Sequence, residues 1–477
     1  HPKSARCVPP PASPPGRGGM AASPPLPKLV QAPEVDFQPW QEEVFSDFNV
    51  SRWMPRTLFE ARHEAGAAEA VVPLGAAEQD RCCLPVDLAL TFTPGGRMEP
   101  GRLAEALGRS LAHFPPAAGR FVRRAVQPEG CPERELRFCI LCNNAGAAFR
   151  AMSADGKLPP TVGLLAPKLF DRALATEPTA AGGPGGPLLR TQLLDFEDGQ
   201  LLTLSLARGL ADVVGLGIFL QCWARLYRGE DAGGSPALDR VALELLQTWP
   251  QPRLESNFVS LHHPEPPEHE AVVRGSLVTS VLFGSEELLS MVESISQRCR
   301  KKLLIYDSET LSSAEVLFAT VVESLRVPLV GCLTLDLRET YGFPTLFGHA
   351  RALIDLELPR EIIRIASALR KLPQIAESRD FWSWKATQPR HSLEGRLVLD
   401  SWLSGLDLHA MRFGDAAPVG VNLSTTFWQE CVANPAACGS GHVLLLPHAE
   451  GILMQGLLPR QAAIRLSTGR SFSTWQP

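Results

Sequence analysis

The stretch from Leu201 to Arg228 constrains the fold more than any other part of the chain. Its beginning, Leu201–Ala207, is mostly apolar and follows an Asp198-Gly199 turn pair, which is typical of a buried strand. Its second part carries apolar residues at spacings of three and four, which predicts an amphipathic helix with one buried face. These apolar residues are Leu216, Phe219, Leu220, Trp223, Ala224 and Tyr227.

Two charged residues, Arg208 and Asp212, lie between the predicted strand and the predicted helix. Charged side chains inside an apolar run are costly to bury unless they are paired. We therefore expect the loop that carries them to be part of a functional site.

Composition limits the class of protein. The chain has 477 residues, 45% hydrophobic and 20% charged, which is an ordinary globular composition long enough for two domains. A net charge of −5 argues against a nucleic-acid partner. No apolar run reaches the length of a membrane span, because Arg208 and Asp212 interrupt the best candidate.

The eleven cysteines are scattered and form no cluster with metal-ligand spacing. They are typical of structural thiols in a reducing compartment, so we expect neither disulfides nor a metal site. The segment His1–Pro33 is rich in Pro, Gly, Ser and Ala and has no acidic residue, which predicts disorder. A basic, acid-free segment leaves a plastid transit peptide open as the alternative to a cytoplasmic protein, and Met20 is a candidate start.

The central loop and helix also resemble the signature of the BAHD acyltransferases, enzymes that transfer acyl groups from coenzyme A to alcohols or amines. The family pattern is a strand, then His-x-x-x-Asp-Gly, then Phe-Leu-x-x-Trp-Ala-x-x-x-Arg-Gly. Asp212 occupies the signature Asp, whereas Arg208 stands at the position of the catalytic His and Val213 at that of the Gly. The matching helix positions are Phe219, Leu220, Trp223, Ala224, Arg228 and Gly229.

Further blocks follow the family's order from about residue 37 to residue 466. His113–Arg120 is similar to its YPLAGR turn, and Cys142–Phe149 to its CNNxGAxF segment. Asp336 and Arg338 match its DxR block, and His349 stands where the following block has Asn. The remaining matches are Trp402 of an SW strand and Phe413, Gly414 and Pro418 of the DFGWGKP block.

This resemblance implies a two-domain chloramphenicol-acetyltransferase-like α/β fold, with mixed sheets flanked by helices and a channel between the domains. The expected organisation is a disordered segment at 1–36, an acyltransferase-like domain at 37–230, a crossover loop at 231–272 and a second such domain at 273–477. The residue patterns alone predict two halves joined by a long loop, and the topology comes from the resemblance.

Several individual elements follow from local patterns. Pro100–Phe114 has the spacing of an amphipathic helix, and Ser312–Leu325 begins with a Ser and Glu315 that suit a capping box. A short helix is expected at Leu238–Thr248. Two strands, His442–Pro447 and Ile452–Leu458, are expected to form the last hairpin.

Acyl transfer from a thioester needs a base that takes the proton of the attacking acceptor, and a neutral imidazole suits this role. Arg208 cannot replace it, because a guanidinium group stays protonated in proteins. The resemblance implies that Asp212 is structural and pairs with Arg338. Arg208 is instead a candidate for binding an acceptor carboxylate or a coenzyme A phosphate, or for a simple pair with a carboxylate such as Asp212. His349 is a candidate for substrate binding or for a substitute base.

The expected function is therefore transfer of an acyl group, other than an amino-acyl group, from acyl-CoA to an alcohol or amine, with weakened activity or a changed acceptor. The open alternative is a non-catalytic pseudoenzyme that binds a ligand in the retained channel. A condensation-type domain of a peptide synthetase is a third reading. We expect a cytoplasmic monomer with acyl-CoA as co-substrate, a small-molecule acceptor, no permanently bound cofactor and no metal.

Overall fold

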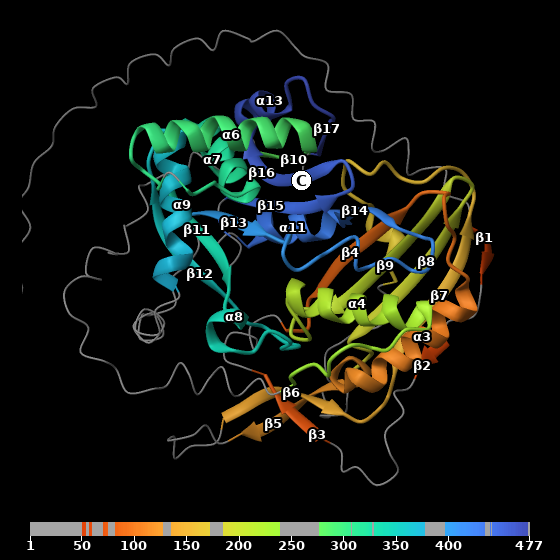
Figure 1. Ribbon diagram of the computed structural model, residues 1–477. Coiled ribbons are helices and arrows are strands. Elements are labelled where there is room, and N and C mark those ends of the chain that lie inside the picture. The colour runs from red at the N-terminus through yellow and green to blue at the C-terminus, as the bar shows by residue number, and fades with distance from the viewer. Residues whose placement is uncertain are drawn as a thin grey trace, which may run out of the picture. The chain divides into compact units, whose positions relative to one another are not determined.

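One mixed sheet runs through most of the chain (Figure 1). The computed structural model describes residues 50–53, 57–59, 70–74, 82–126, 135–171, 185–238, 276–306, 308–326, 329–376, 396–434, 439 and 441–475. Fourteen of the strands in these ranges belong to that sheet, whose main path is β1-β7-β8-β9-β4-β14-β15-β13-β11-β12. Strands β10, β16 and β17 continue from β15, and β3, β6 and β5 form a separate sheet.

The strands have the following bounds: β1 Val50–Trp53, β2 Thr57–Phe59, β3 Ala70–Pro73, β4 Pro85–Phe92, β5 Arg120–Val126, β6 Glu135–Cys142, β7 Ala147–Ala154, β8 Leu189–Phe196, β9 Gly199–Ala207, β10 Ser276–Gly284, β11 Leu329–Asp336, β12 Arg351–Leu358, β13 Leu397–Ser401, β14 Pro418–Leu423, β15 Gly441–His448, β16 Gly451–Pro459 and β17 Phe472–Trp475. The α-helices are α3 Pro100–His113, α4 Val213–Arg228, α6 Ser285–Lys301, α7 Ser313–Leu325, α8 Arg338–Tyr341, α9 Ile362–Ala376, α11 Thr425–Ala433 and α13 Arg460–Ser467.

The sheet is mixed because it combines hairpins with crossover connections. Strands β8 and β9 form an antiparallel hairpin, whereas β7 pairs with β8, β11 with β13 and β13 with β15 in parallel. Strand β9 is buried along its whole length between β8 and β4. A strand with neighbours on both sides and cover on both faces must be apolar throughout. That requirement explains the Leu-rich sequence of β9.

Helix α4 begins and ends at residues suited to those positions. The carboxylate of Asp212 caps its first turn by accepting the Gly215 N–H, and Gly229 ends it in the left-handed conformation at φ 82°. The apolar face of α4 packs against α3, and the indole N–H of the fully buried Trp223 donates to the Leu103 carbonyl. These contacts fix the helix that follows the central loop.

The two halves of the chain meet in shared structure. Strand β14 pairs antiparallel with β4, so a segment near residue 420 extends the sheet of the first half. The larger apolar core accordingly includes Phe413, Val421 and Trp428 beside Leu88 and Phe219. A second core is built from α6, α7, α9 and α13 against β10, β15 and β16. Of the expected crossover at 231–272, the structure describes only 231–238.

Most local predictions are confirmed. Helix α3 covers the predicted Pro100–Phe114, and α7 starts after Ser312 with the reciprocal Ser312–Glu315 capping box. The final hairpin is β15 with β16. The predicted helix at Leu238–Thr248 and the predicted disorder at 1–36 lie outside the described residues. None of the described helices is long and apolar enough to span a membrane.

The close approach of α4 to the segment at Gly405 predicts the effect of one substitution. A Cβ at Gly217 would lie 1.7 Å from the Gly405 carbonyl oxygen, which is backbone and cannot rotate away. Ala favours a helix over Gly by about 1 kcal/mol, but the overlap outweighs this gain. We expect Gly217→Ala to lower the free energy of unfolding by about 1–3 kcal/mol, measured by urea denaturation. Gly95→Ala, where a Cβ meets nothing within 4 Å, is the matched control. Equal stability of the two variants would contradict this packing.

Candidate active site

The loop between β9 and α4 is held by its backbone. The Arg208 N–H donates to the Leu84 carbonyl at 2.8 Å, and the Gly209 N–H donates to the Cys82 carbonyl at 2.9 Å. A Cβ at Gly209 would lie 2.6 Å from the Cβ of Cys82, so the tight approach requires glycine there. The loop therefore presents the Arg208 side chain from a fixed backbone.

Asp212 is the most completely hydrogen-bonded residue of this loop. Its carboxylate accepts two bonds from the Arg338 guanidinium, at 2.7 and 3.1 Å. It also accepts the backbone N–H groups of Gly215 and Ala350, both at 2.9 Å. The side chain thus joins the start of α4 to a segment 138 residues later in the chain. Asp212 and Arg338, which the sequence analysis places as a pair, are brought together.

Arg338 completes the network from the other side. It is 1% exposed, and its guanidinium donates to the carbonyls of Leu346 and Gly348 and to the carboxylate of Asp336. A buried guanidinium is tolerated only when its charge is paired and its N–H groups have acceptors. Arg338 meets both conditions, and the backbone around residues 346–350 is shaped to provide the acceptors.

Burial and charge act in opposite directions on this pair. Burial raises the pKa of Asp212, but the charges of Arg338 and His349 and the hydrogen bonds lower it further, so the pKa lies below its ordinary value of 3.8. Burial lowers the pKa of Arg338, while Asp212 and Asp336 raise it above its ordinary value. The pair is therefore ionised, and Asp212 cannot serve as a proton donor or acceptor at neutral pH.

His349 contacts the central loop through its backbone. Its Nε2 lies 2.5 Å from the Arg208 carbonyl oxygen, which can only accept, so Nε2 carries the proton. This contact fastens the loop that carries Arg208. The role of His349 in substrate binding or as a substitute base stays a prediction.

Arg208 itself is half-buried. Within the part of the chain that the structure describes, its guanidinium has no hydrogen-bond or ion-pair partner. Asp212 does not pair with it, because all four bonds of that carboxylate go to Arg338 and backbone N–H groups. The alternative that Arg208 simply pairs with Asp212 is therefore wrong. The loop therefore carries a cation that has no partner among the described residues.

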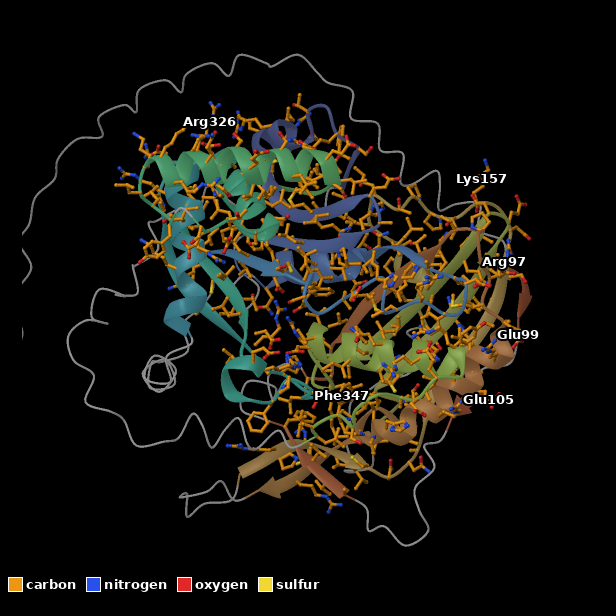
Figure 2. The ribbon with its side chains drawn as sticks, viewed as in Figure 1. Arg97, Glu99, Glu105, Lys157, Arg326 and Phe347 are labelled. Carbon is orange, nitrogen blue, oxygen red and sulfur yellow. The ribbon has the colours of Figure 1, made fainter. Side chains whose placement is uncertain are left out.

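An aromatic contact fixes the segment opposite the loop. Phe347, labelled in Figure 2, packs edge to face on Phe114 with ring centroids 4.9 Å apart, and Phe114 packs in the same way on Phe219 of α4 at 5.2 Å. Both contacts have the geometry that aromatic pairs prefer. They place the backbone of residues 346–350 against the start of α4 independently of the ion pair.

Sequence reasoning missed the backbone partners of the site. Nothing in the residue types indicates that the Gly348 carbonyl accepts from both Arg338 and the Asp212 N–H, or that the Ala350 N–H donates to Asp212. Among the described residues no group of His, Cys, Asp and Glu could hold a metal ion, and the eight described cysteines form no disulfide. The described residues of the site can therefore act on a substrate through charge and hydrogen bonds.

The ion pair predicts a specific dependence of stability on pH. Asp212→Asn removes the buried anion of Arg338 and leaves it only the more exposed Asp336, so the free energy of unfolding at pH 7 should fall by about 3–5 kcal/mol. Because the folded-state pKa of Asp212 is depressed, this stabilisation is present above its ordinary value of 3.8 and is lost as the pH falls through the lower folded-state value. Urea denaturation should show that wild type and variant differ in free energy of unfolding by a constant amount above about pH 4. Below about pH 4 this difference should become smaller.

The control for that experiment is an exposed ion pair. Glu361 and Arg364 lie 3.3 Å apart on side chains that are 51% and 68% exposed. Pairs of this kind contribute about 0–1 kcal/mol. Asp212→Asn having no larger effect than Glu361→Gln would contradict the role given to the buried pair.

Comparison with known proteins adds independent information. The model of the Transferase family matches residues 81–305, which include the whole loop and α4. Vinorine synthase has a similar structure, with 16% identity, a TM-score of 0.56, and coverage of 87% of this chain and 96% of that chain. No curated protein matches the chain in sequence at a significant level.

Two further solved structures share the fold. One is TRI101 of F. graminearum in complex with coenzyme A and T-2 mycotoxin, with 15% identity, a TM-score of 0.58, and coverage of 85% of this chain and 99% of that chain. The other is the first condensation domain of the CDA synthetase, with 14% identity, a TM-score of 0.54, and coverage of 84% and 94%. The predicted chloramphenicol-acetyltransferase-like α/β fold is confirmed by these matches. Over residues 81–305, the chain is similar to the Transferase family, whose model matches this stretch.

Proposed function

We propose that the protein transfers an acyl group from acyl-CoA to a small alcohol or amine, and that Arg208 binds an anionic group of one substrate at the reacting centre. The family and the fold, which are those of acyltransferases, support the reaction class. The complex of TRI101 with coenzyme A supports acyl-CoA as the co-substrate. The described cysteines form no disulfide, which fits a reducing compartment such as the cytoplasm.

The observation that carries the proposal is the half-buried Arg208 on a clamped loop. The described residues offer its guanidinium no acceptor, while Asp212, Arg338 and His349 hold the loop on both sides. A partly desolvated charge without a partner costs free energy, and a bound carboxylate or phosphate would repay that cost with two parallel hydrogen bonds. The site is thereby organised for an anion before any substrate arrives.

The chemistry must proceed without the family's base. The acceptor oxygen or nitrogen attacks the thioester carbonyl, the carbon–sulfur bond breaks, and coenzyme A leaves as a thiolate that takes up the acceptor's proton through water. Absence of a positioned base lowers such rates by about 10²–10⁴-fold. An amine that is neutral at the working pH needs no base before attack, so amines are favoured over alcohols. A carboxylate on the acceptor would be oriented by Arg208.

The non-catalytic alternative has narrower support. It rests on the replacement of His by Arg at position 208, which removes one contribution to the rate and leaves the fold and the Asp212–Arg338 clamp in place. Binding of a ligand in a retained channel without reaction would need the same anion contact at Arg208. Turnover with a panel of acceptors therefore separates the two readings.

The test follows release of free coenzyme A thiol with short acyl-CoA donors and paired acceptors that differ only by a carboxylate. We expect wild type to use the carboxylated amine better than its uncharged counterpart. Arg208→Gln should raise KM for the carboxylated amine about tenfold or more, because a charge-assisted bond of roughly 1.5–3 kcal/mol is lost. Arg208→His should speed transfer to the uncharged alcohol by about 10²–10⁴-fold, because it supplies a base.

Arg225→Gln, on the exposed face of α4, is the matched control and should leave every rate unchanged. A KM ratio between the two acceptors that is the same in wild type and Arg208→Gln would overturn the role of Arg208. No thiol release by wild type or by Arg208→His with any acceptor would overturn acyl transfer and favour the non-catalytic reading.

A further inference from the structure

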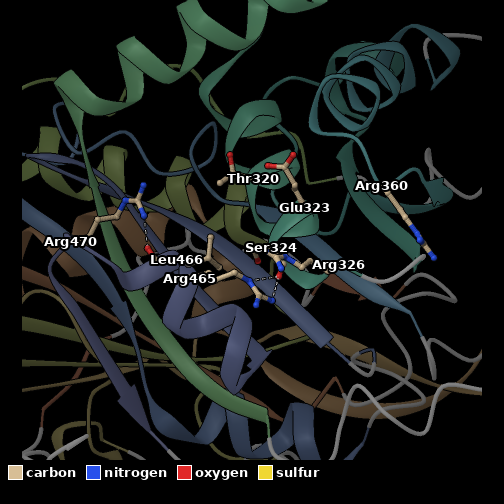
Figure 3. Close-up of a pocket in the computed structure, with 8 residues that line it drawn as sticks. All are labelled: Thr320, Glu323, Ser324, Arg326, Arg360, Arg465, Leu466 and Arg470. Carbon is tan, nitrogen blue, oxygen red and sulfur yellow. Dashed lines mark hydrogen bonds between the residues drawn. The ribbon is translucent and has the colours of Figure 1, made fainter. Parts of the chain in front are cut away.

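A second group of arginines lies at a pocket in the other half of the chain. The pocket has a volume of about 520 Å³ and lies where the C-terminal end of α7 meets α13 and the segment leading to β17 (Figure 3). Its charged lining consists of four arginines and one glutamate, which are Arg326, Arg360, Arg465, Arg470 and Glu323. None of its lining residues belongs to the central loop or its clamp.

The arginines of this pocket differ in how far they are neutralised. Arg470 is paired with Glu287 at 2.5 Å and lies over the Phe283 ring, so it adds little net charge. Arg465 donates Nε and Nη2 to the Ser324 carbonyl, a neutral acceptor. Within the described ranges, Arg326 and Arg360 have neither a hydrogen-bonded nor an ion-paired side-chain partner. The lining therefore includes three arginines that no described carboxylate pairs with, and one carboxylate, that of the exposed Glu323.

The geometry keeps positive charge close together at the end of α7. Arg326 ends the helix in the left-handed conformation at φ 60°. Gly or Asn usually occupies such a position, because the left-handed conformation costs other residues about 1–2 kcal/mol. Arg465 caps the Ser324 carbonyl, so it covers the negative end of the helix. Burial lowers the pKa of Arg465, and the charge of Arg326 lowers it further. The end of α7 thus carries two neighbouring cations, Arg326 and Arg465.

From these observations we propose that this pocket binds the phosphate groups of a phosphorylated small molecule. A single carboxylate is too small and too weakly charged for a space of about 520 Å³ lined by three unneutralised arginines. Guanidinium groups match phosphate oxygens with paired N–H donors, and a doubly charged phosphate repays the mutual repulsion of the cations. Arg326 and Arg465 are the principal contacts, and Arg360 stands apart from them in Figure 3 and contributes at longer range.

The ligand could be a free phosphorylated metabolite or the phosphate-bearing end of coenzyme A. Both present the same chemistry to the arginines, and the inference holds whether or not the protein transfers acyl groups. Competition distinguishes the two sources, because coenzyme A would displace a phosphate probe only if its phosphates occupy the same pocket. Sodium triphosphate is a suitable probe because it carries no base, sugar or thiol.

Isothermal titration calorimetry of triphosphate into the full-length protein tests the proposal. We expect saturable binding at a single site that weakens with added salt, and a loss of affinity of about tenfold or more in Arg326→Gln. Arg326 is exposed and its side chain has no partner among the described residues, so the variant should fold as wild type does. Arg364→Gln removes one exposed arginine outside the pocket and should bind as wild type does.

Three results would contradict the proposed phosphate site. These are no binding of triphosphate, equal affinity in wild type and Arg326→Gln, or an equal loss of affinity in Arg326→Gln and Arg364→Gln. The last would mean that triphosphate responds to net charge alone. Where binding is specific, prior saturation with coenzyme A identifies the source of the phosphate. Displacement assigns the pocket to the donor, and unchanged binding assigns it to a separate phosphorylated ligand.

Discussion

The ion pair of Asp212 and Arg338 is the interaction on which the candidate site depends. It joins residues 126 positions apart, and both partners also bond the backbone of residues 346–350: Arg338 donates to the Gly348 carbonyl, and Asp212 accepts the Ala350 N–H. Because the Asp212 carboxylate also caps α4, the helix start, the loop and residues 346–350 form one hydrogen-bonded unit. Removing one partner of a buried, fully hydrogen-bonded ion pair lowers the free energy of unfolding strongly. This makes it a geometric clamp, with no part in proton transfer.

The clamp does not depend on the side chain at position 208. The loop is held through backbone groups at Arg208 and Gly209 and through the carboxylate of Asp212, so no contact that holds it uses the Arg208 side chain. The Arg208 side chain therefore contributes its charge to the site without supporting the framework. The pocket beside α7 shows the same feature, since Arg326 adds charge to a helix end that Arg465 already caps.

The elements that local patterns determine could be predicted from the sequence. The strand–loop–helix at 199–228, helix α3 and the capping box of α7 each follow from residues close together in the chain. The pairing of β14 with β4 and the arginine pocket could not be predicted, because they depend on contacts between distant segments. The pairing of Asp212 with Arg338 was predicted from the family resemblance. The hydrogen bonds from the Gly215 and Ala350 N–H groups could not be predicted, because almost every residue type has a backbone N–H.

Hydrogen exchange of the intact protein, followed by mass spectrometry on peptides that span 208–216 and 346–351, tests the clamp most directly. If Asp212 and Arg338 hold these segments as one unit, the amides of Gly215 and Ala350 exchange slowly in wild type. Both peptides should then lose protection together in Asp212→Asn, while the β15–β16 hairpin keeps its own. Loss of protection in one peptide alone, or in neither, would show that the segments are held separately and would contradict the account.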